Sequence, residues 1–429
     1  MTNERTLPSE FGNRPRKVLH VLNSAAGGAA LSTLGLIEQF RAQGIAACAV
    51  CHDAGSPEEC ERLREATDGE TLFTPLYWWN RKIRIPAWKR PLSELKQLIR
   101  TGWTHRSSGQ VANFAMAHGA DLIHTNTLTT PEGGIAARRL GLPHVWHIRE
   151  LVGPCATHPT PFQGRRLGQY LAAHCSKLIA NSDVTASYVR SCVPDDLLEV
   201  VPNGIELSHF EIRRGPAQPD RLVVAMIGNP TARWKKHALF IEAASRVDRG
   251  IAIEWRIYGH DPSQGGRLLG NPYVDQLHAR IAEAGLADRF AWPGFVSDPA
   301  EIMSQIDLLV HPADAESFGR IVVEAMAAGL PTIGVRGGGV AEIIDSGVTG
   351  LLAEPDDPIG LATAIEQLVR DPARRQAMGA AGRRRAGQRY SLAACATGVM
   401  RVYESALQRP VGKSFSQVAA AHGITDRRV

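Results

Sequence analysis

Short apolar runs alternate with longer amphipathic stretches along almost the whole chain. The runs that predict strands are Val18–Asn23, Ala46–Cys51, Leu122–Thr125, His144–Ile148, Leu178–Asn181, Leu198–Val201, Leu222–Ile227, Ile253–Tyr258, Arg289–Trp292, Leu308–His311, Thr332–Val335 and Gly350–Ala353. Stretches between them, such as Ala238–Val247 and Tyr273–Ala284, have the spacing of helices. Strands that alternate with helices are typical of βαβ units and parallel sheets. The pattern predicts an α/β protein with a doubly wound, Rossmann-like sheet in each half.

The length fits two domains better than one, because 429 residues exceed what a single core usually supports. The polar segment 208–220, with two prolines and a glycine, is the best candidate linker. We therefore expect an N-terminal domain over residues 1–207 and a C-terminal domain over 221–390. Residues 391–429 should add a helix, over Leu392–Leu407, that packs back on the N-terminal domain, and then a tail.

Composition narrows the cellular setting. No run of about 18 uncharged apolar residues is present, so no membrane-spanning helix is expected. The first 15 residues lack the apolar stretch of a secretory signal. Seven scattered cysteines do not suggest a disulfide framework and fit a reducing compartment. The prediction is a cytoplasmic protein.

Glycines follow the first predicted strand. Ligands of open α/β sheets bind beyond the carboxyl ends of the strands, and two such domains would bring these edges to one interdomain cleft. Gly27 and Gly28 lie between strand and helix, where glycine lets a backbone approach an anion. A tight turn without a ligand explains them equally well. The spacing is not GxGxxG, which disfavours a dehydrogenase.

Three cations lie within four residues after the strand Leu222–Ile227. Arg233, Lys235 and Lys236 precede a predicted helix, where cations oppose the helix dipole. A bound diphosphate would compensate them. A solvated basic turn is the alternative.

Two carboxylates flank the start of another predicted helix. Glu316 lies just before it, Ser317 is a candidate N-cap, and Glu324 follows two turns on. About 9 Å of helix axis separates Phe318 from Glu324, and free amides lie between the carboxylates. This layout suits a diphosphate with a hydroxyl-rich ring at each end, as in a nucleotide sugar.

Two other strand ends carry candidate residues. His147 and Arg149 stand at the end of the run His144–Ile148, where a core histidine satisfied by one hydrogen bond is an equal alternative. The glycines 337–339 precede a further helix and suggest close approach of the backbone to a ligand.

At this point the chain resembles a known family. The motif ESFGRIVVE, with seven residues between Glu316 and Glu324, is similar to the Glu-x7-Glu motif of retaining glycosyltransferases with the GT-B fold, and more narrowly to family 4. The blocks GLPHVWHIRE, KLIANSDV, VVPNGIE, GFVSD, EAMAAGLP and GGGVAEII resemble that family's other blocks and occur in its order. The resemblance covers about residues 17–408 and implies two Rossmann-like domains that face a cleft.

The resemblance implies roles at the donor phosphates. Gly27 and Gly28 match the family's glycine loop near the phosphates, and Lys235 matches the lysine that neutralises the diphosphate. The amides around Phe318 and Gly319, next to Ser317, would cap the same group.

The resemblance also implies roles at the two ends of the donor. His147 matches a histidine that lines the donor sugar near the reacting carbon, and Glu316 matches the carboxylate that contacts this sugar. Glu324 would hold the ribose hydroxyls, and the stretch around Val296 would border the base.

One position departs from the family. The arginine expected shortly after Gly228 is replaced by Asn229, and Arg233 is a candidate substitute after an inserted residue. The departure leaves open how many cations face the leaving group, and it keeps a catalytically inactive binding protein as an alternative. A nucleotide-sugar epimerase or hydrolase on the same fold is a second alternative.

The expected activity is transfer of a hexose from a UDP- or GDP-linked sugar to a hydroxyl of a glycan or lipid-linked acceptor, with retention, in surface or envelope glycan synthesis. The family is viewed as lacking an obvious protein nucleophile, so Glu316 is expected to orient the sugar. No Asp-x-Asp is present, and we expect neither a metal nor another cofactor.

A basic, tryptophan-rich segment, 77–106, stands apart from these motifs. It holds eight Lys/Arg, one acid and four of the eight tryptophans, whereas the net charge of the whole chain is only +5. Trp78, Trp79, Arg81 and Lys82 predict an acceptor-side surface that attaches peripherally to an anionic membrane. The alternative is a solvated face with tryptophans packed inward. Nucleic acid is not expected, because no recognisable binding module accompanies the charge.

Overall fold

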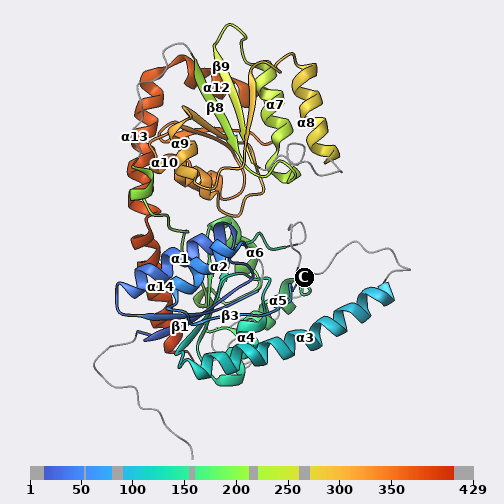
Figure 1. The fold of residues 1–429 in the computed structure, drawn as a ribbon, viewed down its shortest axis with the longest axis vertical. Coiled ribbons are helices and arrows are strands. Elements are labelled where there is room, and N and C mark those ends of the chain that lie inside the picture. Colours follow the sequence, from blue (N-terminus) through green and yellow to red (C-terminus); the bar gives the residue numbers. More distant parts are fainter. Residues whose placement is uncertain are drawn as a thin grey trace, which may run out of the picture. The chain divides into compact units, whose positions relative to one another are not determined.

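The computed structural model describes residues 14–52, 55–79, 90–153, 160–211, 221–259 and 271–409. The chain divides into two compact units. The N-terminal unit runs to Gly204 and includes the chain from Cys395 onward, and the C-terminal unit comprises Ile205–Ala394. Figure 1 shows that each unit is built on its own sheet.

The N-terminal sheet has seven parallel strands in the order β3-β2-β1-β4-β5-β6-β7. Their bounds are β1 Lys17–Leu22, β2 Ala46–Cys51, β3 Thr71–Phe73, β4 Leu122–Thr125, β5 His144–Ile148, β6 Lys177–Ala180 and β7 Leu198–Val200. Strands β1, β2 and β4 to β6 are almost wholly buried, because helices cover both faces of the sheet.

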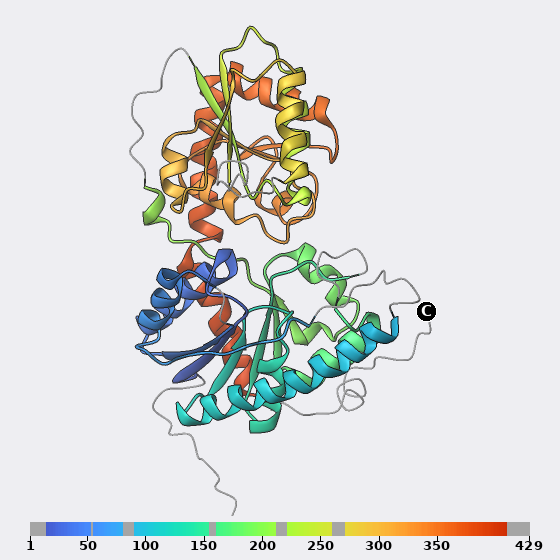
Figure 2. The same cartoon turned by 45° about the vertical axis from the view of Figure 1, so that its right-hand side comes forward.

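Each face of this sheet has its own helices. Helices α1 (Gly27–Arg41) and α14 (Leu392–Leu407) pack on one face against Val18, Leu122 and Val145. Helices α3 (Arg90–Ala117) and α4 (Glu132–Leu140) lie side by side on the other face, as Figures 1 and 2 both show. The remaining helices are α2 Pro57–Ala66, α5 Gly164–His174, α6 Asp183–Arg190 and the 3-10 turn η2 Asp195–Leu197.

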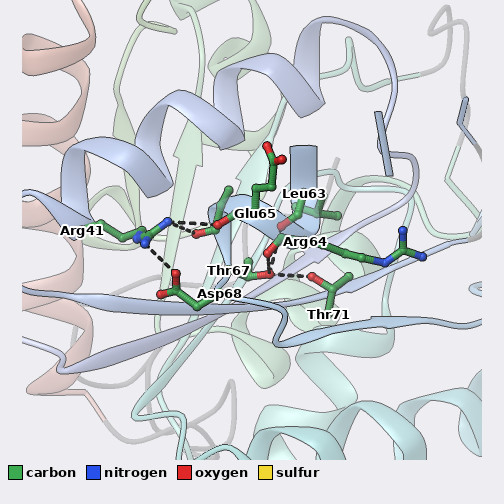
Figure 3. A network of polar contacts seen from close by, with 8 residues as sticks. Arg41, Leu63, Arg64, Glu65, Thr67, Asp68 and Thr71 are labelled. Atoms are coloured by element: carbon green, nitrogen blue, oxygen red, sulfur yellow. Dashed lines mark hydrogen bonds and ion pairs between the residues drawn. The ribbon is translucent and has the colours of Figure 1, made fainter. Parts of the chain in front are cut away.

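A polar network closes the carboxyl end of α2 (Figure 3). Arg41 of α1 donates to the carbonyl oxygens of Glu65 and Ala66 and pairs with Asp68 at 2.6 Å. These carbonyls have no partner inside the helix, so a cation there satisfies them and complements the helix dipole. The contact ties α1 to α2 just before the chain enters β3.

The C-terminal sheet has six parallel strands in the order β10-β9-β8-β11-β12-β13. Their bounds are β8 Leu222–Ile227, β9 Ile253–Tyr258, β10 Phe290–Gly294, β11 Leu308–His311, β12 Thr332–Val335 and β13 Gly350–Ala353. The helices are α7 His237–Arg246, α8 Pro272–Glu283, α9 Pro299–Ser304, α10 Arg320–Ala327, α11 Val340–Ile343, α12 Pro358–Arg370 and α13 Pro372–Arg389, with 3-10 turns η3 Ser208–Phe210 and η4 Arg233–Lys235.

Local sequence signals explain several helix starts in this unit. Helices α9, α12 and α13 each begin with Asp-Pro, at Asp298, Asp357 and Asp371. The aspartate side chain accepts from first-turn amides, and proline at the first helical position has no amide to leave unpaired. Their apolar faces then pack on the sheet: α12 on one face and α9 on the other.

The predicted α/β organisation is confirmed, since every predicted strand is present in one of two parallel sheets. The short strand β3 was not predicted, because its three half-buried residues carry too weak a pattern. The chain passes between the units at Gly204–Ile205, and Ser208–Phe210 of the predicted linker form η3, whose Phe210 is buried in the C-terminal unit. Residues 212–220 lie outside the described residues.

Helix α14 contributes Val399, Val402 and Tyr403 to the core of the N-terminal sheet. None of the helices in the described ranges combines the length and apolarity needed to cross a bilayer.

The approach of α13 to the end of α10 gives a stability prediction. A Cβ at Gly379 would lie 2.1 Å from the carbonyl oxygen of Gly329, whereas at Gly387 of the same helix its nearest neighbour would be 3.9 Å away. Gly379→Ala should lower the free energy of unfolding by about 1–3 kcal/mol. Gly387→Ala should raise it by roughly 0.5–1 kcal/mol through helix propensity. Urea denaturation of both variants tests this, and equal effects would contradict the close packing of α13 on α10.

Candidate active site

The strand order of the C-terminal sheet brings two loops together. Strands β8 and β11 are neighbours at its centre, and the strand order runs outward in opposite directions from them. Open α/β sheets bind ligands at such a switch point, beyond the carboxyl ends of the strands. Lys235 lies in the loop after β8, and Glu316 lies in the loop after β11.

The two predicted residues form an ion pair. Lys235 Nζ lies 2.6 Å from Glu316 Oε2, and both side chains are more than four-fifths buried. Lys235 Nζ also lies 4.3 Å from the centroid of the Trp234 ring. The cation is therefore held in place from two sides at the switch point.

His311, the last residue of β11, is a third member of this cluster. Its Nε2 lies 3.2 Å from the same Glu316 oxygen. Burial lowers the pKa of His311, so the neutral ring donates its Nε2 proton to the carboxylate. Burial alone would raise the pKa of Glu316, but the His311 hydrogen bond and the Lys235 charge outweigh it and lower that pKa to about 2. Glu316 is thus an anion over the whole physiological range.

A second tie joins the same two loops. Lys236 has a left-handed backbone, with φ 61°, which costs a non-glycine residue about 1–2 kcal/mol. Its Nζ lies 3.3 Å from Asp314 and 2.7 Å from Asp356. These ion pairs raise the pKa of Lys236. Lys236 therefore pairs with Asp314 and Asp356, whereas its neighbour Lys235 pairs with Glu316 of the motif.

The start of α10 differs from the prediction in one respect. The helix begins at Arg320 with Gly319 as its N-cap, so Ser317 is not the cap that the sequence suggested. Gly319 has φ 103°, and a Cβ there would lie 2.8 Å from Val340. Phe318 is buried and packs edge-on against Tyr390. The first turn of α10 begins four residues after Glu316, and its Val322 amide donates to Gly319 O at 2.9 Å.

Glu324 lies within α10 and is buried. Its Oε1 accepts from Arg320 Nε at 2.7 Å, one turn earlier. Burial raises the pKa of Glu324 despite the charge of Arg320. The second acid of the motif thus has an environment opposite to that of Glu316.

The residues around the family's missing arginine take different positions. Asn229 closes its own turn, because its Oδ1 accepts from the amide and hydroxyl of Thr231. The Arg233 guanidinium stacks on the Tyr273 ring of α8, 4.4 Å from its centroid. Val296 is half-buried and packs against the core beneath the loop after β10. Whether Arg233 replaces the arginine stays a prediction.

The glycines 337–339 pack closely against the motif loop, and their approach to a ligand stays a prediction. Cβ atoms at Gly338 and Gly339 would lie 2.5 Å from Glu316 O and 2.7 Å from Phe318 Cα. Gly339 N donates to Glu316 O at 2.8 Å. Gly338 and Gly339 therefore have no room for a side chain, because the backbone of the motif loop packs directly against them.

The N-terminal unit holds the other predicted residues. Gly27, with φ 84°, starts α1, and it and Gly28 are exposed. His147 lies in β5 and is fully buried, and burial and the nearby Arg149 charge hold its pKa well below its usual range. Its Nδ1 lies 3.3 Å from a guanidinium nitrogen of Arg149.

Sequence reasoning missed two partners in these clusters. His311 was predicted only as the end of a strand. Its position five residues before Glu316 is the signal that could have indicated a partner of that carboxylate. Asn203, which accepts from Arg149, carries no signal in the sequence beyond its place in the VVPNGIE block. Within the described ranges, no group of three or more His, Cys, Asp or Glu side chains is arranged to hold a metal ion.

The residues of the predicted membrane surface fall into two groups, one packed in the core and one exposed. Trp79 packs against Trp146 and Tyr170, with ring centroids 6.1 and 4.5 Å away, so it follows the inward-packed alternative. Trp78 is 42% exposed. Arg81 and Lys82 lie outside the described residues.

Family models match both units. The model described as Glycosyltransferase Family 4 matches residues 26–209, and the one described as Glycosyl transferases group 1 matches residues 209–385. A protein of Corynebacterium kroppenstedtii named D-inositol 3-phosphate glycosyltransferase is 37% identical over 308 residues, which cover 67% of this chain and 68% of that protein. The Paenarthrobacter aurescens protein of the same name is 28% identical over 318 residues, which cover 68% of this chain and 74% of that protein.

Solved structures share the fold. The Anabaena protein HepE in complex with UDP and glucose superposes with a TM-score of 0.70 at 21% identity, over 91% of this chain and all of that one. Sucrose-phosphate synthase from Thermosynechococcus elongatus gives a TM-score of 0.66 at 18% identity, over 95% of this chain and all of that one. With its two parallel sheets, its Glu-x7-Glu helix and these relatives, the chain belongs to the family 4 glycosyltransferases of the GT-B fold.

Proposed function

We propose that the enzyme transfers a hexose from a nucleoside-diphosphate sugar, UDP-linked in the first instance, to an acceptor hydroxyl with retention at the anomeric carbon. The observation that carries the proposal is the Lys235–Glu316–His311 cluster at the β8/β11 switch point. HepE was solved with UDP and with UDP-glucose, which supports a uridine nucleotide.

The chemistry follows from the charges of this cluster. The bond between the anomeric carbon and the diphosphate breaks, and the acceptor oxygen bonds to that carbon on the same face. The acceptor proton passes to the departing phosphate oxygen, so no protein nucleophile is needed. Negative charge grows on the leaving diphosphate, and Lys235 and the first amides of α10 stabilise it. Because these groups supply the neutralising charge, we propose that the reaction needs no metal.

Glu316 has two roles in this scheme. As the counter-ion of Lys235 it keeps the lysine ordered and desolvated, and its free oxygen is available to a sugar hydroxyl. Glu324, whose raised pKa and Arg320 partner distinguish it, would accept from the ribose hydroxyls. His147 would line the sugar, as the family resemblance implies.

The acceptor is proposed by class only. The relatives named D-inositol 3-phosphate glycosyltransferase support a hydroxyl acceptor. A glycan or lipid-linked acceptor in surface or envelope glycan synthesis remains our proposal. Radiolabelled UDP- and GDP-sugars, incubated with and without acceptor extracts, separate the classes: a transferase labels the extract, a hydrolase or epimerase changes the sugar without it, and an inactive binder does neither.

Removal of the cation tests the assignment directly. Lys235→Ala should lower the transfer rate about 10²- to 10³-fold, because one preorganised charge at the leaving group is lost. It should also reduce the thermal stabilisation that UDP gives the wild type. Arg246→Ala, at an exposed pair on α7, is the matched control and should leave both unchanged. Full activity of Lys235→Ala would refute the role of Lys235. NMR of the product's anomeric configuration tests retention.

The opposite pKa shifts of the two motif acids give a pH prediction. The lowered pKa of Glu316 contributes stability that is present above about 4.5 and lost as pH falls toward about 2. Glu316→Gln should therefore be destabilised near pH 7, on the order of 1–3 kcal/mol, and approach the wild type as pH falls through this window.

Glu324→Gln is the contrasting variant. Because burial raises the pKa of Glu324, its ionisation costs stability as pH rises above 4.5. The free energy of unfolding of Glu324→Gln should therefore rise relative to that of the wild type as pH increases above 4.5. Denaturation curves between pH 3 and 8 measure both trends, and the same trend in the two variants would contradict the opposed environments.

We also propose that the N-terminal unit attaches peripherally to an anionic membrane surface. Arg100, Trp103 and Arg106 are exposed and three residues apart on α3, so they share one stripe of the helix. Trp103 is 50% exposed, and its ring lies 5.3 Å from Tyr77 beside the exposed Trp78. Aromatic and basic side chains on one stripe suit an interface with anionic head groups.

Sedimentation with vesicles tests this attachment. Trp78→Ala combined with Trp103→Ala should reduce binding to phosphatidylglycerol-containing vesicles severalfold and leave the weak binding to phosphatidylcholine unchanged. Met116→Ala, exposed at the far end of the same helix, is the control. Trp79 is left intact because it packs in the core. Wild-type binding that does not depend on anionic lipid would end the proposal.

A further inference from the structure

A row of buried histidines crosses the N-terminal sheet. His20 of β1 and His124 of β4 are directly paired in register, and His147 follows on β5. Ring centroids lie 5.3 Å apart for the first two, and 5.4 Å apart with nearly parallel planes for His124 and His147. Tyr403 of α14 reaches the row, with its hydroxyl 2.6 Å from His124 Nδ1.

Arg149 closes this row just beyond β5. Its side chain is nearly fully buried. The guanidinium donates to Asn203 Oδ1, and it lies 3.5 Å from Asn126 Oδ1 and 3.3 Å from His147 Nδ1. Asn126 is itself fixed, because its Oδ1 accepts from Thr33 at 2.9 Å. The two amides therefore set the direction of the guanidinium, and its Nη2 faces both Asn126 Oδ1 and His147 Nδ1.

This contact determines which nitrogen of His147 carries the proton. A guanidinium has donors and no acceptor, so the facing Nδ1 has to present its lone pair. The proton of the neutral ring then sits on Nε2. The low pKa of His147, caused by burial and by the Arg149 charge, agrees with a ring that stays neutral.

The other nitrogen has no partner within the described part of the chain. His147 Nε2 is buried and makes no hydrogen bond there. A buried N–H without an acceptor costs about 1–3 kcal/mol, a cost that a bound ligand oxygen would remove. The ring thus holds one buried N–H whose acceptor is not found among the described residues.

We infer that Arg149 is a positioning residue that holds His147 as the neutral Nε2–H tautomer, so that this N–H donates to an oxygen of the bound donor substrate. The inference rests on the proposed function for the identity of that substrate. The tautomer itself follows from the contacts of Arg149 and does not depend on activity.

Long-range ¹H–¹⁵N NMR of histidine-labelled protein tests the tautomer, with His147→Gln used to assign the signal. The wild type should show a protonated Nε2 and an unprotonated Nδ1 at neutral pH. Arg149→Met should convert this to a mixture of tautomers, whereas Arg190→Met, at an exposed pair of the same unit, should not. A wild-type ring with its proton on Nδ1, or charged, overturns the inference, as does an unchanged signal in Arg149→Met.

Kinetics with UDP-sugar separate positioning from structure. Arg149→Met should lower kcat about 10- to 100-fold with little change in the donor KM, the loss that follows removal of the partners that orient metal-bound histidines. Unchanged kcat with a changed tautomer would refute the functional part. If Arg149→Met does not fold, Asn203→Ala loosens the same guanidinium and should give the same mixed tautomer. Absence of transfer in the wild type would refute the proposed function and leave the tautomer result standing.

Discussion

Parallel pairing of β8 with β11 makes the switch point of the C-terminal sheet, because the strand order runs outward in opposite directions from this central pair. The loops after both strands lie at this switch point. Lys235 and Glu316 come from these two loops and are 81 residues apart in the chain, yet they meet at 2.6 Å. The glycines 337–339 pack behind the motif loop, and the left-handed Lys236 ties the other loop to Asp314. All of these features depend on that one pair of strands.

Charge compensation decides what each acidic or basic group can do. An unpaired lysine as buried as Lys235 would be costly, and Glu316 and the Trp234 ring offset that cost. Two acids in one motif acquire opposite pKa shifts, because Glu316 has a histidine and a lysine as partners while burial dominates at Glu324. The same residue type thus serves as a permanent anion at one end of the motif and a protonation-sensitive group at the other.

The N-terminal unit uses burial in another way. Its central strands place histidines, which titrate near neutral pH in water, in surroundings that keep them neutral. Arg149 reinforces this and orients the last ring. The basic, tryptophan-rich segment also divides by burial: Trp79 joins the aromatic core around Trp146, while Trp78 and Trp103 stay at the surface. One compositional feature therefore contains both core and surface residues.

The sequence by itself determined the two sheets, nearly all the strands and the helix that follows Glu316 and carries Glu324. Burial on both faces requires continuous apolar runs, and these are visible without a structure. Motif spacing also predicted Lys235, Glu316 and Glu324 as site residues. Only the tertiary structure decided that His311 shares the Glu316 oxygen, that Gly338 and Gly339 serve packing, and that Arg149 faces Nδ1 of His147. Such contacts depend on which strands are neighbours and which way each side chain points, and an apolar run looks the same whatever strand lies beside it.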